Sequence, residues 1–271
     1  MTDRRAALVF WLLSTAPAAA ASAGCGQPPP DRPPQAVGLE GGARGILVAV
    51  PEAYDPAVPH RLIVAFHGRT NPAERVRRYY GLEDAAKRPT IVVYPRAERQ
   101  SDGTFVWRLP QDAALFDAVV ERMAADYCVD RDRVFAVGHS LGATFANTLA
   151  CARGETLRGV ATVAGGIQPA ECRGEAAALL LHHPQDRLVP VETGQAARDA
   201  LLAANDLPAT PAESFAEPYV CRRYGAADDP APVAWCLHDQ SATRTGRTYA
   251  HQWPDGAEQA ALAFFRALEG D

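Results

Sequence analysis

The feature that most constrains this chain is the pentapeptide Gly138-His139-Ser140-Leu141-Gly142, in which two glycines flank a serine. The apolar run before it (133–138) is strand-like, and the segment after it (141–152) has helical spacing. A serine on such a strand-to-helix turn has a strained backbone, and the glycines relieve crowding because they lack side chains. The pattern predicts an exposed, nucleophilic Ser140.

Short apolar runs alternate with helical segments from about residue 43 onward. Strand-like runs cover 45–50, 61–68, 90–95, 133–138, 159–166 and 178–183, and helical spacing covers 112–126, 141–152 and 193–204. Continuous apolar strands separated by helices are typical of a parallel sheet covered on both faces. We therefore predict one α/β domain over residues 43–271, with a mostly parallel central sheet and helices on both faces.

A serine nucleophile needs a base and an orienting acid, which follow it in the chain order Ser, Asp or Glu, His. Asp186 comes just after the buried run 178–183, where a carboxylate can hold an imidazole. His251 precedes the last helix, whereas the other later histidine, His238, lies in a strand-like run. Rival acids in polar or proline-rich stretches are Asp206, Asp228 and Asp229. The predicted triad is Ser140, Asp186 and His251.

The early run 61–68 ends in His67-Gly68, which resembles the turn that supplies a second oxyanion donor. The backbone N–H groups of Arg69 and Leu141 would then hold the oxyanion. We expect the substrate site to be lined by His67, Gly68, His139 and Trp253. This chemistry needs no metal and no organic cofactor.

The N-terminus has the features of an export signal over residues 1–25. Arg4 and Arg5 precede an apolar run (6–13) and a tract of small residues. Two cleavage sites compete: Ala21-Ser22-Ala23 fits an ordinary secretory signal, and Ser22-Ala23-Gly24-Cys25 resembles a lipobox. The second, which we favour, would lipidate Cys25 and tether the protein to a membrane. The five prolines of residues 26–42 predict a semi-extended tether. The protein is expected outside the cell or in the cell envelope.

Charge and cysteine content narrow the partners and the covalent links. A net charge of −5 argues against nucleic acid, which needs a basic surface, and we expect a monomer. Export permits disulfides among the six cysteines. Cys221 and Cys236 flank a loop between two strand-like runs and are predicted to pair. Cys128 and Cys151 could meet at the lower edge of the sheet and leave Cys172 over; the alternative is Cys151–Cys172 with Cys128 free.

Several segments together resemble a known group of proteins. The matching segments are 67–69, 130–134, 138–142, 163–166 with Cys172, the acid loop from His182 to Pro190, and His251-x-Trp253-Pro254. They are similar to the secreted polyhydroxybutyrate depolymerase and feruloyl/acetylxylan esterase group of α/β-hydrolases, including its lipoproteins. Two positions depart from the pattern: His183 and Ala250 stand where the group has glycine.

The resemblance implies an α/β-hydrolase fold and a secreted serine carboxylic ester hydrolase that uses Ser140, Asp186 and His251. Its expected substrates are hydroxybutyrate polyesters or oligomers, or feruloyl and acetyl esters of polysaccharides. Two alternatives keep the same fold. A cell-envelope acyltransferase would pass the acyl group to an alcohol instead of water, and a hydrolase-like binding protein would not catalyse at all.

Overall fold

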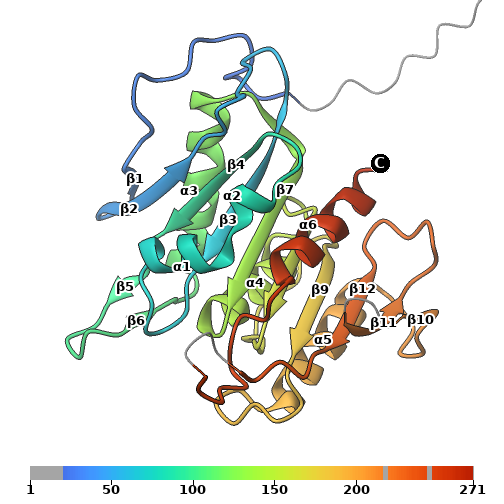
Figure 1. Cartoon of the computed structure of the whole chain (residues 1–271). Coiled ribbons are helices and arrows are strands. Elements are labelled where there is room, and N and C mark those ends of the chain that lie inside the picture. The colour runs from blue at the N-terminus through green and yellow to red at the C-terminus, as the bar shows by residue number, and fades with distance from the viewer. Residues whose placement is uncertain (1–20, 216–218, 243–245, 271) are drawn as a thin grey trace, which may run out of the picture.

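The structure, a computed structural model, describes residues 21–215, 219–242 and 246–270. Within them, ten strands form one sheet in the order β1-β2-β4-β3-β7-β8-β9-β12-β11-β10 (Figure 1). The strands of this sheet are β1 (Ala36–Leu39), β2 (Gly42–Ala49), β3 (His60–Phe66), β4 (Thr90–Pro95), β7 (Val129–His139), β8 (Gly159–Val163), β9 (Ala177–His182), β10 (Glu213–Phe215), β11 (Val220–Tyr224) and β12 (Val233–Leu237). A separate hairpin joins β5 (Glu98–Arg99) to β6 (Phe105–Val106).

The centre of the sheet, from β4 to β12, is parallel, and the strands at both edges are antiparallel. Strand β3 is buried at every position, as expected for a strand covered on both faces. The predicted α/β-hydrolase architecture, a mostly parallel sheet in a single domain, is therefore confirmed.

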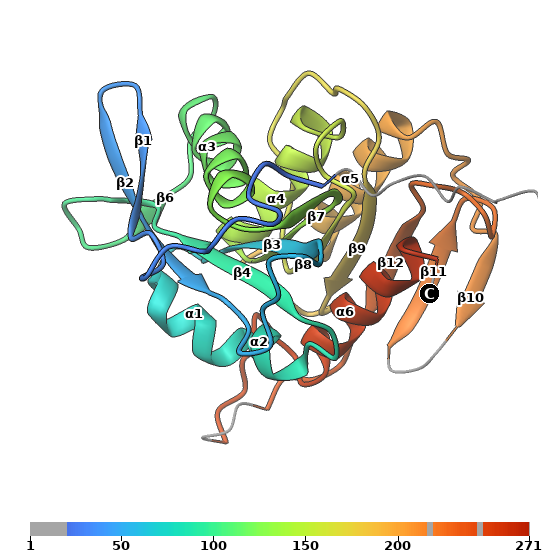
Figure 2. The same ribbon diagram turned by 90° about the horizontal axis from the view of Figure 1, so that it is seen from above.

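Helices cover both faces of this sheet (Figure 2). One face carries α3 (Gln111–Asp126), α4 (Leu141–Ala152) and α5 (Val191–Ala204), and the other carries α1 (Ala73–Tyr80), α2 (Leu82–Ala85) and α6 (Ala257–Leu268). None of the helices in the described residues is both long enough and apolar enough to cross a membrane.

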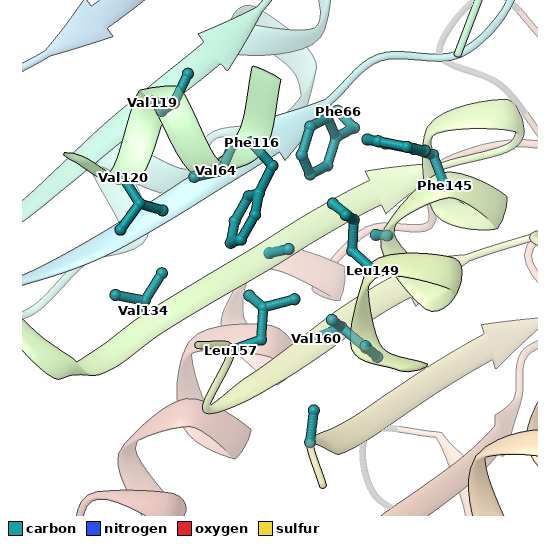
Figure 3. Close-up of a cluster of buried hydrophobic side chains, with 14 of the residues drawn as sticks. Val64, Phe66, Phe116, Val119, Val120, Val134, Phe145, Leu149, Leu157 and Val160 are labelled. Carbon is teal, nitrogen blue, oxygen red and sulfur yellow. The ribbon is translucent and has the colours of Figure 1, made fainter. Parts of the chain in front are cut away.

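Alternate residues of each strand point to opposite faces, so one strand contributes to two cores. Along β3, Leu62, Val64 and Phe66 join the first core, and Ile63 and Ala65 join the second. Figure 3 shows the first core, where side chains of α3 and α4 pack over the strands. Both cores fix the carboxyl ends of the central strands, where the predicted site residues follow.

Residues 1–20 of the predicted export signal lie outside the described residues, and the signal stays a prediction. The described part of the N-terminus packs on the domain, so the predicted tether is wrong. Ser22 is buried, its hydroxyl donating to the Tyr127 carbonyl (2.8 Å) and accepting from the Val129 N–H (2.9 Å). Strand β1 and the start of β2 fall within the predicted tether 26–42. Proline content suggested an extended linker, but this segment pairs its backbone with the domain instead.

Two further predictions about cysteine are corrected. Cys25 forms a disulfide with Cys128, which is incompatible with lipidation of Cys25 because one sulfur cannot hold both a disulfide and a thioether-linked lipid. The pairing Cys128–Cys151 is therefore wrong, and the alternative Cys151–Cys172 is observed. The chain leaving β8 must return to the lower edge of the sheet before parallel β9 begins, and this carries Cys172 back to the end of α4. The pair Cys221–Cys236 is confirmed.

Candidate active site

Ser140 lies on a sharp turn between β7 and α4. Its φ of 59° and ψ of −124° are strained for a residue with a side chain. The turn is close-packed, because a Cβ on Gly142 would lie 2.1 Å from the Phe66 carbonyl oxygen and one on Gly138 would lie 2.3 Å from that of Gly142. The two glycines are therefore required sterically, as the sequence predicts.

A continuous chain of hydrogen bonds links the three residues of the predicted triad. Ser140 Oγ lies 2.7 Å from His251 Nε2, and His251 Nδ1 lies 2.6 Å from Asp186 Oδ2. The acid follows β9 and the histidine precedes α6, so residues 111 positions apart meet above the sheet. Asp186 and His251 are each 5% exposed, which shields their interaction from water.

The other oxygen of Asp186 is also held. Its Oδ1 accepts the N–H groups of Leu188 (2.8 Å) and Val189 (3.1 Å). Burial raises the pKa of Asp186, but the hydrogen bonds from His251 and from these two amides outweigh it and leave the pKa below its usual value. The ionised carboxylate requires a proton on His251 Nδ1, and so Nε2 presents a lone pair to the Ser140 hydroxyl.

Two backbone N–H groups adjoin Ser140 without an acceptor among the described residues: Arg69 N–H, on the turn after β3, and Leu141 N–H, at the start of α4. The turn lies directly against the serine, since a Cβ on Gly68 would be 3.4 Å from Ser140 Cβ. Free N–H groups on either side of a nucleophile are the donors that a tetrahedral oxyanion needs.

A cavity of about 840 Å³ opens over Ser140. Gly68, His139 and Trp253 line it, as predicted. His67 does not: its side chain is fully buried behind the turn, so its prediction as a lining residue is wrong. His67 is next to Gly68 in the sequence, but that position does not show in which direction its ring points. In the structure the ring points into the protein interior.

Other residues of the cavity wall escaped sequence reasoning. They are Thr70, Asn71, Tyr79, Leu188, Val189, Ala242, Tyr249, Gln252 and Asp255. Leu188 and Tyr249 are large apolar side chains that are 65% and 44% exposed. Both lie within two residues of a predicted triad member, and that proximity was the signal that could have identified them.

His139 packs its ring on that of His251, with the ring centroids 4.9 Å apart. Burial, followed by the proximity of His251, lowers the pKa of His139 to about 3, so this ring stays neutral beside the triad. In the described part of the chain, no three His, Cys, Asp or Glu side chains are grouped as a metal site would require.

Comparison with known proteins finds similar esterases. No family model matches the chain. Probable feruloyl esterase C of Aspergillus terreus is 31% identical over 187 residues, which are 65% of this chain and 66% of that protein. Feruloyl esterase D of Neurospora crassa is 28% identical over 265 residues, 87% of this chain and 88% of its own. The chain is thus similar to known feruloyl esterases over 65% and 87% of its own length.

Solved esterase structures are similar in fold. Acetyl xylan esterase from Aspergillus awamori superposes with a TM-score of 0.60 at 13% identity, covering 82% of this chain and 94% of its own. At such identity the match shows the fold alone. The chain spans slightly less than two thirds of the Aspergillus feruloyl esterases C it matches. The polyhydroxybutyrate depolymerase part of the resemblance stays a prediction.

Proposed function

We propose that this protein is a secreted serine esterase that hydrolyses carboxylic esters through Ser140, His251 and Asp186. The observation that carries the proposal is the unbroken chain of hydrogen bonds from Asp186 through His251 to Ser140, at 2.6 and 2.7 Å. A buried carboxylate, a correctly protonated imidazole and a serine on a strained turn together make the hydroxyl nucleophilic.

The reaction follows from these atoms. Ser140 Oγ attacks the ester carbonyl while His251 Nε2 takes the hydroxyl proton, and the carbonyl oxygen becomes an oxyanion facing the Arg69 and Leu141 N–H groups. His251 then returns the proton to the departing alcohol as the C–O bond breaks. Water, deprotonated by the same nitrogen, attacks the acyl-enzyme and releases the acid and Ser140. Asp186 stabilises the imidazolium in both steps.

The proposed substrates are feruloyl or acetyl esters of polysaccharides, with hydroxybutyrate polyesters and oligomers as the other predicted class. The names of the relatives support the first class, as do the aromatic walls of the cavity, Tyr79, Tyr249 and Trp253. Disulfides that include all six cysteines support an extracellular or cell-envelope location.

The test compares hydrolysis of p-nitrophenyl acetate, p-nitrophenyl butyrate and methyl ferulate by the wild type and Ser140→Ala. Ser101→Ala, in an exposed turn, is the matched control. We expect Ser140→Ala to lose at least about 10⁴-fold in kcat on all three esters and the control to keep wild-type turnover. Unchanged activity in Ser140→Ala would refute the proposal. Transfer of the acyl group to an added alcohol in preference to water would make the protein an acyltransferase.

A further inference from the structure

His67 makes two hydrogen bonds that only one form of its ring can make together. Its Nε2 lies 3.0 Å from the Ala97 nitrogen, and its Nδ1 lies 2.9 Å from the Gly68 carbonyl oxygen. Because the Ala97 N–H is a donor, Nε2 must accept, and the ring proton is on Nδ1, which donates to Gly68. Burial lowers the pKa of His67, which keeps this neutral form.

The contact with Gly68 fixes more than a carbonyl. The Gly68 C=O and the Arg69 N–H belong to one peptide unit, and this unit is trans. In a trans peptide the C=O and N–H point in opposite directions. A carbonyl held toward His67, inside the protein, therefore turns the Arg69 N–H away from His67 and toward the side where Ser140 lies.

This restraint is needed because glycine by itself gives the turn little rigidity. A glycine backbone adopts conformations that other residues avoid, so the peptide after Gly68 could rotate if nothing held it. The neighbouring carbonyls are also held: His67 O accepts Trp107 Nε1–H (2.9 Å), and Arg69 O accepts the Phe105 N–H (2.8 Å). The peptide that carries the free N–H depends on the His67 side chain.

Resting on the proposed esterase function, we propose that His67 is a positioning residue that orients the Arg69 N–H as an oxyanion donor by holding the Gly68 carbonyl. The ring touches neither substrate nor Ser140, since it is fully buried and absent from the cavity wall. The ring therefore acts only through the hydrogen bond that the Arg69 N–H makes once the oxyanion has formed.

Two substitutions separate the two contacts of the ring. In His67→Asn the amide nitrogen stands as many bonds from the backbone as Nδ1, so it can donate to Gly68 but cannot reach Ala97. In His67→Gln the amide oxygen stands as many bonds from the backbone as Nε2, so it can accept from Ala97. The amide nitrogen is then one bond farther out than Nδ1 and does not stand at the donor position to Gly68. If the Gly68 contact positions the oxyanion donor, His67→Gln should lose more activity than His67→Asn. If only the Ala97 contact matters, as in a purely structural role, His67→Asn should lose more.

The measurement is steady-state kinetics on p-nitrophenyl acetate, with active sites counted by titration so that only folded enzyme contributes. We expect His67→Gln to lower kcat by 10- to 100-fold, below the loss of about 10²–10³ that follows removal of a whole donor. KM should change less than threefold, because the oxyanion is absent from the ground state. His67→Asn should stay within fivefold of the wild type. Affinity for a boronic acid that forms a tetrahedral adduct on Ser140 should fall in parallel with kcat.

Wild-type kcat in His67→Gln, or an equal loss in His67→Asn, would overturn the inference. If His67→Gln does not fold, His67→Met, which is similar in size and has no donor, carries the same expectation. The outcome differs from failure of the proposed function itself, in which the wild type would not hydrolyse the ester or Ser140→Ala would hydrolyse it equally well.

Discussion

Removal of the disulfide between Cys25 and Cys128 should destabilise the protein more than removal of the one between Cys221 and Cys236. The first fastens the N-terminal segment to the residue before β7, and it closes a loop of 103 residues. The second joins the neighbouring strands β11 and β12 and closes a loop of only 15 residues.

The magnitude follows from the freedom that each bond removes from the unfolded chain. In the chain-entropy treatment, a loop of 103 residues is worth about 4.7 kcal/mol at 25 °C and one of 15 residues about 3 kcal/mol. The double variant Cys25→Ala/Cys128→Ala should therefore lose about 1.7 kcal/mol more than Cys221→Ala/Cys236→Ala. The two variants remove the same atoms, so the second is the control for the first.

The assay is urea-induced unfolding of the purified protein, followed by tryptophan fluorescence and extrapolated to zero denaturant. Mass spectrometry after alkylation without reduction should find no free thiol in the wild type. A loss of less than about 1 kcal/mol on removing the Cys25 bond, or a free or lipid-modified Cys25 in the purified protein, would refute the docking of the N-terminal segment.

Three further predictions concern the site and its support. Asp186→Asn should lower kcat by about 10⁴-fold with little change in KM, because the amide favours the wrong tautomer of its imidazole partner; steady-state kinetics tests this, and a loss below tenfold would contradict it. Burial, and after it the nearby histidines, lowers the pKa of His238 in the folded protein to about 4, against about 6.5 for a histidine in the unfolded chain. As the pH drops, the unfolded chain therefore binds the proton first, and the free energy of unfolding falls. In urea unfolding at pH 7 and 4.5, His238→Phe should lessen that fall by about 2–3 kcal/mol, and an unchanged fall would disprove it. Gly142→Ala should prevent folding, since its Cβ would lie 2.1 Å from the Phe66 carbonyl, whereas Gly38→Ala, with nothing within 4 Å, should fold normally by circular dichroism.

Sequence patterns predicted the parts of this structure that depend on local chemistry and chain order. The strained turn at Ser140 needs glycines at 138 and 142, and steric requirements of that kind are visible in a sequence. Asp186 and His251 could be predicted because one follows a core strand and the other precedes the last helix. In the structure His251 hydrogen-bonds to both Ser140 and Asp186. Their catalytic roles stay predictions.

The wrong predictions share one cause: each depends on contacts between residues far apart in the chain, which local composition does not predict. Residues 26–42 are as rich in proline as a flexible tether. They are nevertheless held to the domain by the pairing of β1 with β2 and by the Cys25–Cys128 disulfide. Cys128 is the wrong partner for Cys151 because the loop between β8 and β9 brings Cys172 back to the end of α4, and no local pattern gives the path of that loop. The position of His67 behind its turn depends on ring direction, which sequence does not give.

The most direct test of the central claim is covalent labelling of the protein with a fluorophosphonate, read by intact mass and peptide mapping. The arrangement of Asp186, His251 and Ser140 predicts one adduct per molecule, on Ser140, formed far more slowly in His251→Ala and absent from Ser140→Ala. No adduct on the folded wild type, or an adduct on another serine, would contradict it.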